Sequence, residues 1–164
     1  RYAIYFNGQD ITDSARLQKY KGKVVDFVEV GRQQPEIEHR FKDFNSYADY
    51  NPIVDKSFRI CSNDDSYFTY SLKTKSGVKN TLVITLYGKQ TSKESKDCAV
   101  KVYIGDTELT LLKVVNTEKD DVYDVEFEIP VEYQKKSRVT VKFYNAGSEF
   151  EAAQIYEVRT IKEY

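Results

Sequence analysis

The stretch from Val28 to Phe41, VEVGRQQPEIEHRF, gathers residue types that commonly take part in chemistry. It contains His39, the only histidine of the chain, among several carboxylates and guanidinium groups. A histidine whose pKa is near the ordinary value of about 6.5 can act as a metal ligand or a proton shuttle. Because no second histidine or cysteine lies nearby in the sequence, a hydrogen-bonded structural histidine is the favoured interpretation of His39.

A proline restricts the backbone of the same stretch. Pro35 fixes its own φ angle and disfavours a helical conformation at Gln34. We therefore expect a rigid extended crossing between a strand at Val24–Val30 and the next strand at Glu38–Phe44. In a protein of several domains, such a polar crossing is a candidate docking edge. Its candidate contact residues are Gln34, Glu36 and His39.

The chain has two cysteines, Cys61 and Cys98, which lie 37 positions apart. Neither belongs to a Cys-x-x-Cys or Cys/His pattern of the kind that binds zinc. A thiolate nucleophile needs a nearby base or metal, and neither cysteine has such a motif around it. Two separate buried thiols are the favoured interpretation, and a disulfide is the alternative.

Abundant carboxylates raise the question of glycoside hydrolysis, which uses two acids about 5–10 Å apart. Glu126 and Glu128 would project from one face of a strand about 7 Å apart. Their neighbours on that face are solvent-type residues, so a hydrated sheet surface is favoured and no catalytic residue is assigned. The acidic turns Asn63–Asp65 and Lys119–Asp121 leave a structural calcium ion as an alternative, although each turn supplies only two carboxylates.

Sugar binding needs exposed aromatic faces beside planar hydrogen-bonding groups. The chain has 14 tyrosines and 9 phenylalanines but no tryptophan, and most of these rings are expected in the core or on sheet surfaces. The predicted loop Asn45–Asp55, NSYADYNPIVD, is the best candidate for an exposed platform, and an ordinary polar connection is the alternative. Its candidate sugar contacts are Tyr47, Tyr50, Asn45 and Asn51.

Strands must position these candidates, because apolar and polar residues alternate with a period of two along much of the chain. The clearest strands are Tyr123–Ile129, Tyr67–Leu72, Thr81–Tyr87, Val100–Ile104 and Arg138–Tyr144. Looser candidates are Leu109–Val115, Ser57–Cys61, Val24–Val30 and Gln154–Ile161. Gly105-Asp106 predicts a two-residue hairpin, and helical segments are expected only at Ile11–Tyr20 and Val131–Lys136.

Many short antiparallel strands with few helices predict an all-β fold, a two-sheet antiparallel β-sandwich of jelly-roll, galactose-binding-domain-like type. We expect residues 1–22 to form an N-terminal strand and a short helical lead-in, and residues 23–164 to form the sandwich. The net charge of −1 argues against nucleic acid and anionic membranes as partners. The longest apolar run, Thr81–Tyr87, is too short to span a membrane.

Several motifs follow one another in a recognisable order. They are Gly31-x-Gln33-Gln34-Pro35-Glu36-Ile37-Glu38-His39-x-Phe41-Lys42, Phe58-Arg59, Tyr67–Leu72, Tyr87-Gly88, Pro130, Val139–Phe143 and Val158–Thr160. Together they resemble the C-terminal β-sandwich of bacterial glycoside hydrolases related to family 127, the β-L-arabinofuranosidase group. Tyr2–Phe6 resembles the last strand of the domain that precedes this sandwich. The departures from the pattern are Glu38 in place of aspartate, Arg40 in place of asparagine, and Asp64-Asp65-Ser66 in place of Gly-Gly.

The resemblance implies a non-catalytic accessory module that packs on and stabilises a catalytic barrel. In that family the catalytic apparatus, a cysteine nucleophile on a zinc site, belongs to an upstream helical barrel, and neither Cys61 nor Cys98 matches it. The implied partner is this upstream domain of the same polypeptide. An autonomous carbohydrate-binding module that contacts an oligosaccharide through tyrosine-rich loops is the alternative, and a hydrolase is a third. Because such enzymes digest glycans, a periplasmic or extracellular location is also implied.

Overall fold

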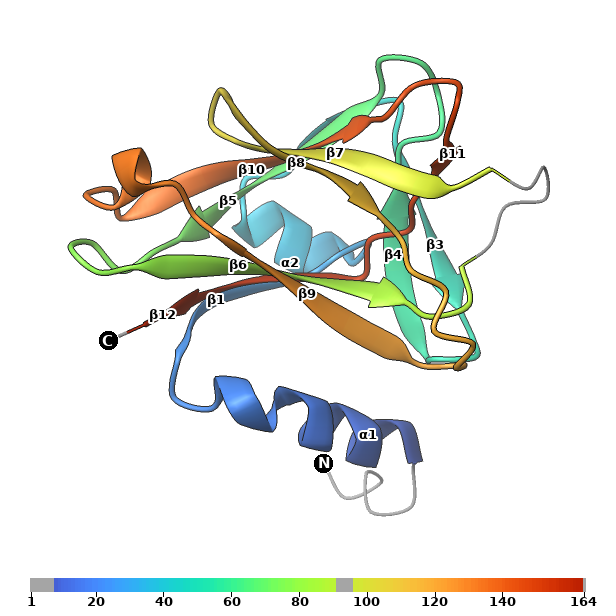
Figure 1. Cartoon of the computed structure of the whole chain (residues 1–164), viewed down its shortest axis with the longest axis horizontal. Coiled ribbons are helices and arrows are strands. Elements are labelled where there is room, and N and C mark those ends of the chain that lie inside the picture. The colour runs from blue at the N-terminus through green and yellow to red at the C-terminus, as the bar shows by residue number, and fades with distance from the viewer. Residues whose placement is uncertain (1–7, 91–95, 164) are drawn as a thin grey trace.

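The chain forms two packed β-sheets in a computed structural model, which describes residues 8–90 and 96–163 (Figure 1). The first sheet has four antiparallel strands in the order β1-β12-β6-β9. These strands are β1 (Val24–Glu29), β12 (Glu157–Lys162), β6 (Asn80–Tyr87) and β9 (Val122–Glu128). The first and last strands of the described chain are therefore neighbours at one edge of this sheet.

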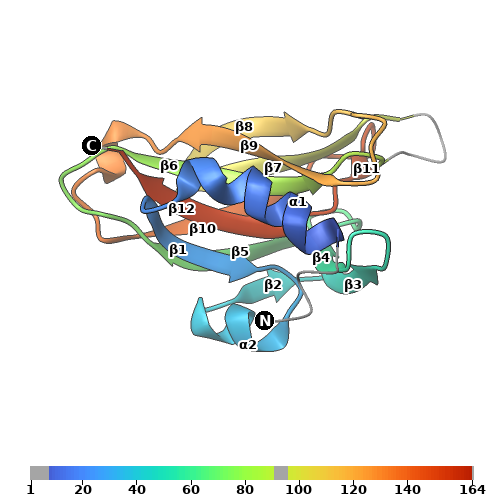
Figure 2. The ribbon, with the colours of Figure 1, turned by 90° about the horizontal axis from the view of Figure 1, so that it is seen from below.

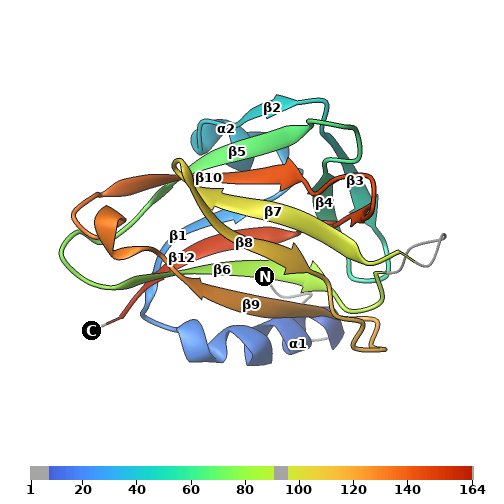
Figure 3. The ribbon, with the colours of Figure 1, turned by 45° about the horizontal axis from the view of Figure 1, so that its top comes forward.

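The second sheet has six strands in the order β11-β7-β10-β5-β2, with β8 paired to β7. These strands are β2 (Lys42–Phe44), β5 (Tyr67–Lys73), β7 (Cys98–Ile104), β8 (Thr107–Lys113), β10 (Arg138–Asn145) and β11 (Glu151–Ala152). Among the strand pairs described, only β11 with β7 is parallel. A separate hairpin of β3 (Tyr47–Asn51) and β4 (Lys56–Ile60) lies at one end of the sandwich (Figures 1 and 3).

The core lies between the two sheets and is built by alternate residues of each strand. In β5 the pattern is regular, because Phe68, Tyr70 and Leu72 are buried while the residues between them are partly exposed. Inward-facing side chains of this kind are removed from water, which is the main source of stability in a sandwich. The largest fully buried side chains are Tyr70, Tyr156, Phe68, Phe143, Leu72, Leu82, Ile84, Leu86, Ile104 and Ile155.

A helix covers the outer face of the four-stranded sheet (Figures 1 and 2). It comprises α1 (Gly8–Leu17) and a 3-10 turn, η2 (Gln18–Tyr20). Tyr20 packs with Leu17 against Val83 of β6, whose neighbours in the strand face the inner core. All eight residues of β6 are consequently buried, which explains why its sequence is the most continuously apolar run of the chain.

The structure confirms the predicted fold class, a mostly β sandwich of antiparallel sheets with few helical segments. The five clearest strand predictions correspond to β9, β5, β6, β7 and β10. The two-residue hairpin is also present, because β7 ends at Ile104, β8 begins at Thr107, and Gly105 between them has a φ of 55°. The predicted turn after Pro130 is the 3-10 helix η3 (Val131–Tyr133).

Two local predictions are wrong. The expected extended crossing is instead a short helix, α2 (Gln33–Glu38), and β2 begins at Lys42 rather than Glu38. Pro35 lies in the first turn of α2, where a missing N–H costs no helical hydrogen bond. The expected loop Asn45–Asp55 is also wrong in part, because Tyr47–Asn51 is strand β3, paired along its length with β4.

The outer face of β9 is exposed at Glu126 and Glu128, as predicted, but α1 covers it at Asp124. Arg16 of α1 donates to both carboxylate oxygens of Asp124, whose side chain is only 3% exposed. Tyr20 donates to Glu126 at 2.8 Å, and Glu128 remains exposed.

The predicted division of the chain at residue 22 stays a prediction, and its N-terminal strand, Tyr2–Phe6, lies outside the described residues. None of the described helices is long and apolar enough to cross a membrane.

Candidate functional site

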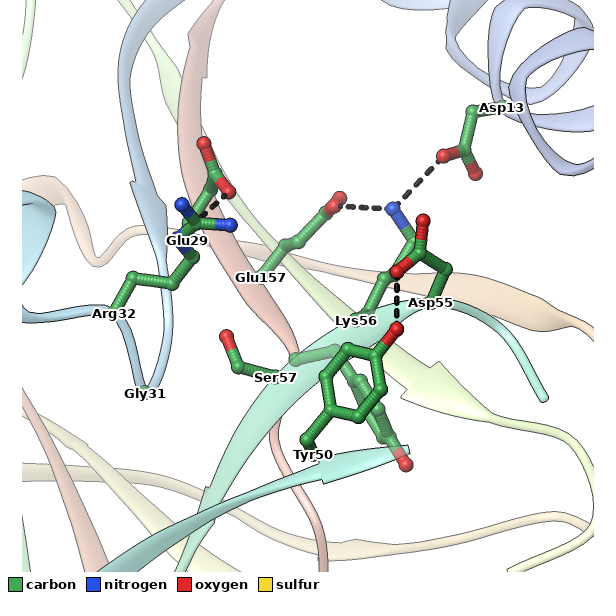
Figure 4. Close-up of a pocket in the computed structure, with 10 residues that line it drawn as sticks. Asp13, Glu29, Gly31, Arg32, Tyr50, Asp55, Lys56, Ser57 and Glu157 are labelled. Carbon is green, nitrogen blue, oxygen red and sulfur yellow. Dashed lines mark hydrogen bonds and ion pairs between the residues drawn. The ribbon is translucent and has the colours of Figure 1, made fainter. Parts of the chain in front are cut away.

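A pocket of about 430 Å³ opens where the β3–β4 hairpin meets the ends of β1 and β12 (Figure 4). One wall is formed by the hairpin, the opposite wall by the turn after β1, and the floor by the start of β12 and the side of α1. Its lining residues are Asp13, Glu29, Gly31, Arg32, Tyr50, Asp55, Lys56, Ser57, Tyr156 and Glu157.

A close backbone contact shapes the wall after β1. Gly31 has a φ of 83°, and a Cβ at this position would lie 2.7 Å from the carbonyl oxygen of Phe58 in β4. The Ser57 hydroxyl donates to the Val30 carbonyl at 2.7 Å, which holds β4 against the same turn. Only glycine fits both the left-handed backbone and this contact, so Gly31 sets the width of the pocket at this point.

The hairpin wall presents an aromatic side chain to the pocket. Tyr50 is 52% exposed, and its hydroxyl donates to the carboxylate of Asp55 across the hairpin turn. This hydrogen bond raises the pKa of Tyr50 and fixes the direction of its ring. Behind it, the Asn51 amide donates to the Tyr156 hydroxyl at 3.0 Å. The pocket therefore has an oriented, half-exposed ring with a carboxylate beside it (Figure 4).

The floor of the pocket is a network of buried ion pairs. The Lys56 ammonium lies 2.8 Å from Asp13 and 2.9 Å from Glu157, as Figure 4 shows. Arg16 and Arg159 each lie 3.1 Å from the other oxygen of Glu157. Burial alone would raise the pKa of Glu157, but these three cations lower it to about 2. Glu157 is therefore a fixed carboxylate and a poor proton donor.

The lining charges favour an uncharged polar ligand. Four carboxylates, those of Asp13, Glu29, Asp55 and Glu157, face two cations, so the lining carries a formal net charge of −2. The second cation, Arg32, is exposed and lies 3.8 Å from Glu29. Carboxylates and a guanidinium group can bind hydroxyl groups from both sides, whereas a negative ligand would be repelled. The arrangement suits binding through hydrogen bonds and ring contact.

The predicted sugar contacts are separated in the structure. Tyr47 and Tyr50 are three residues apart in β3, so their side chains point to opposite faces of the hairpin. Tyr47, which is 48% exposed, lines a different cavity of about 400 Å³ beside Gln90 and Phe150. Asn45 is an exposed turn residue with a φ of 53°. Of the four predicted residues, Tyr50 contacts the pocket and Asn51 supports its wall.

The predicted docking residues have mainly internal partners, which is a correction to the docking hypothesis. Glu36 is 4% exposed and binds both Arg59 nitrogens Nε and Nη2, at 2.9 and 2.8 Å. Its carboxylate also accepts from the Tyr70 hydroxyl and from the Gly31 N–H. A buried carboxylate so fully paired cannot contact a partner.

His39 is likewise a buried structural residue, 8% exposed. Its Nε2 lies 2.8 Å from Asp26 and its Nδ1 lies 2.6 Å from the carbonyl of Pro35. Gln34, by contrast, is exposed, and its side chain donates to Glu38 within its own helix. Gln34 is therefore the one predicted docking residue that a partner could reach.

The remaining candidates for chemistry are also placed by the structure. Cys61 and Cys98 are unpaired and buried, and burial raises the pKa of both thiols. In the two acidic turns, Asp65 accepts from the Tyr144 hydroxyl and Asp120 from the Tyr87 hydroxyl. Over the described ranges, no group of three or more histidine, cysteine or carboxylate side chains is arranged to hold a metal ion.

Sequence reasoning missed most of the pocket. Lys56, Ser57 and Glu157 belong to strands that were predicted only loosely, and they meet through pairing between distant segments. Arg32 and Glu29 were within the stretch considered for chemistry but had no motif to single them out. The Pro52–Asp55 turn that orients Tyr50 lies within the predicted loop Asn45–Asp55, because Tyr47–Asn51 has no regular alternation to indicate a strand.

The fold is similar to that of carbohydrate-binding modules. A family 35 module from Clostridium thermocellum superposes with a TM-score of 0.53 and 6% identity, over 73% of this chain and 90% of that chain. The C-terminal family 6 module of LamC, a marine laminarinase from Zobellia galactanivorans, gives a TM-score of 0.56 and 12% identity, over 83% and 98%. At these identities the likeness concerns the fold alone, and it defines the class as a jelly-roll sandwich of the carbohydrate-binding-module type.

A domain of a larger enzyme is also similar. An exo-β-1,3-galactanase from Phanerochaete chrysosporium gives a TM-score of 0.57 and 9% identity, over 82% of this chain but only 28% of that chain. Residues 19–161 match the family of unknown function DUF6805, and the chain belongs to this family. The comparison with curated proteins gives no match. All pocket residues except Asp13 lie within the matched range.

Proposed function

We propose that the domain is a non-catalytic carbohydrate-binding module of a glycan-active enzyme, and that the pocket beside Tyr50 holds an uncharged sugar. The observation that carries the proposal is the pairing of a half-exposed ring with hydrogen-bonding groups in one concave site. Sugar rings stack their C–H faces on aromatic side chains, while planar polar groups bind their hydroxyls. The similarity in fold to carbohydrate-binding modules supports this reading.

The polar residues of the pocket have complementary tasks. The Tyr50 ring, held by its bond to Asp55, supplies the stacking surface. Arg32 supplies donors, and Glu29 supplies acceptors on the opposite wall (Figure 4). Glu157 is occupied by Lys56 and two arginines, so it holds the floor rigid and does not serve as a catalytic acid. A site of this kind binds sugar without cleaving it.

Calorimetric titration of the chain with arabinose-containing and galactose-containing neutral oligosaccharides tests the proposal. We expect measurable heat for one of these classes, and Tyr50→Ala should weaken binding by about 2- to 10-fold, because an aromatic contact contributes about 0.5–1.5 kcal/mol beyond its buried area. Tyr47→Ala is the matched control, because Tyr47 has similar exposure on the same strand but faces the other cavity. Absence of heat at millimolar sugar, or equal loss in both variants, would remove the proposal.

A second candidate is an accessory role in which the domain packs on a catalytic barrel. The resemblance to the C-terminal sandwich of family 127 enzymes supports it, as does the exposed end of α2, where Gln34 lies beside Ile37, which is 61% exposed. In that setting the enzyme would be periplasmic or extracellular. Ile37→Glu in the whole enzyme should lower the melting temperature of the barrel, while the isolated sandwich is unaffected. An unchanged barrel would exclude this contact.

A further inference from the structure

The outer face of the six-stranded sheet is uncovered, unlike that of the four-stranded sheet. In Figures 1 and 3 no described segment lies over β5, β10 and β7 on the side away from the core. Buried residues of these strands, such as Phe68, Val141 and Val102, face inward, so the residues that alternate with them face solvent. Strand register then fixes which outward side chains are neighbours.

Four aromatic rings lie on this face across four strands. Phe44 is opposite Tyr67, Tyr67 is opposite Tyr144, and Tyr103 is one step away on β7. The ring centroids of Phe44 and Tyr67 are 6.2 Å apart, and those of Tyr103 and Tyr144 are 6.4 Å apart. Phe44 is 47% exposed at the edge of the row. Two pairs of aromatic rings therefore lie on the solvent side of this sheet.

Lys142 is at the centre of the aromatic row. Its ammonium lies 4.5 Å from the ring centre of Tyr67, 5.1 Å from that of Tyr144 and 6.0 Å from that of Tyr103. A cation among three rings is held by their negative faces but keeps its charge. Within the described residues no carboxylate forms an ion pair with Lys142.

The strands around the row carry cations and few carboxylates. The outward residues of β2, β5, β10 and β7 include five cations and no carboxylate: Lys42, Lys73, Lys101, Arg138 and Lys142. On β8, Glu108 is opposite Tyr103 and Lys113 is opposite Ala99, so this strand adds one charge of each sign. At the end of the row, Asp65 accepts from the Tyr144 hydroxyl at 2.7 Å. We call this surface, formed by Phe44, Tyr67, Tyr103, Tyr144 and these five cations, the basic aromatic face.

We infer that the basic aromatic face binds an acidic polysaccharide, a chain whose sugars carry carboxylates. The rings provide stacking surfaces for the C–H faces of successive sugars, while the unpaired cations attract the carboxylates from several directions. The face is open and spans several strands, so it suits a chain rather than a single sugar. This site is distinct from the pocket beside Tyr50, and the inference does not depend on sugar binding in that pocket.

A single-stranded nucleic acid is the other polyanion that stacks on aromatic residues of a sheet. The net charge of the chain, −1, leaves no long-range attraction for a dense line of phosphates. A polysaccharide presents apolar C–H surface on every sugar along its chain, which matches a face of four rings with cations beside them. The polysaccharide is therefore the ligand to which the geometry points.

Affinity electrophoresis of the full chain in gels containing polygalacturonate tests the inference. We expect polygalacturonate to retard the protein, with weaker retardation at higher salt, and a neutral galactan to have less effect. Lys42→Glu combined with Lys101→Glu should weaken binding about tenfold or more, because two attractive charges become repulsive. Lys21→Glu combined with Lys119→Glu, on other surfaces, gives the same net charge and should weaken binding far less.

Phe44→Ala provides a second test that keeps the charge. The side chain is half-exposed on an edge strand, so the variant should fold while losing retardation by polygalacturonate. Tyr50→Ala should leave this retardation unchanged, which separates the face from the pocket. The inference is overturned if polygalacturonate has no effect, if both double variants lose binding equally, or if oligothymidine of matched charge binds as tightly as polygalacturonate.

Discussion

The pocket beside Tyr50 and the basic aromatic face use charge in opposite ways. In the pocket, Lys56 lies between two carboxylates, and Glu157 is surrounded by three cations. On the basic aromatic face, Lys142 lies over three aromatic rings. The net charge of the whole chain, −1, does not reveal that one region is acidic and the other basic. Charges with internal partners hold the fold together, and charges without them are available to a ligand.

The two regions should also differ in how much their charges contribute to the free energy of unfolding. An exposed ion contributes little to folding, because water solvates it well in both states. A buried ion that loses its partner is strongly destabilising, because its charge has neither water nor a counterion. Substitutions in the pocket floor should therefore affect the free energy of unfolding, and substitutions on the basic aromatic face should affect binding.

Glu157→Gln is expected to have the largest effect. It leaves Lys56, Arg16 and Arg159 without their shared carboxylate, and the free energy of unfolding should fall by about 3–5 kcal/mol. Lys101→Glu, the comparison on the exposed face, should change it by less than about 0.5 kcal/mol. Urea denaturation of both variants measures the difference. Similar values for the two would show that the pocket floor is no more structural than the open face.

Acid should weaken the fold through the same carboxylate. Because Glu157 has a pKa of about 2 in the folded protein, below its ordinary value of 4.5, its contribution is complete above about pH 4.5. The contribution is then lost as the pH falls from 4.5 towards 2, when protons bind the unfolded chain first. Stability measured across this range should fall more steeply in the parent than in Glu157→Gln. Parallel curves would contradict the assignment.

Gly31→Ala should have a smaller effect, confined to the pocket wall. A left-handed backbone costs a residue with a Cβ about 1–2 kcal/mol, and the contact with the Phe58 carbonyl adds to this. Gly77→Ala is the matched control, because Gly77 has a φ of 82° and nothing within 4 Å of the added atom. Thermal melts of both variants isolate the contact, and equal losses would mean that the close approach to β4 is unimportant.

The strands of this protein could be predicted from its sequence because the pattern of apolar residues in each strand shows which of its faces is buried. Strict alternation in Tyr123–Ile129 and Tyr67–Leu72 indicates one face towards the core and one towards solvent. This signal does not depend on which strand pairs with it. Helix α2 was not predicted because a residue before proline generally favours an extended backbone, whereas Pro35 lies in the first turn of the helix, where proline is tolerated. The cover over Asp124 was missed because a strand does not reveal what packs on its polar face.

The pocket was predictable only in part. Tyr50 could be found because it is an aromatic residue in a polar segment, but its separation from Tyr47 depended on recognising β3 as a strand. Glu157 and Lys56 are 101 positions apart, and no local pattern indicates that they meet. The basic aromatic face depends likewise on register, because Phe44, Tyr67 and Tyr144 are neighbours only after three strands have paired.

The pairing of β1 with β12 has a consequence for how the protein is made. The first strand of the sandwich pairs with the last. During synthesis Val28 therefore cannot pair with Val158 until all the residues between them have left the ribosome. β12 also brings Glu157 and Arg159 to the floor of the pocket. Synthesis of the final strand therefore completes the sheet, the ion network and the ligand pocket in a single step.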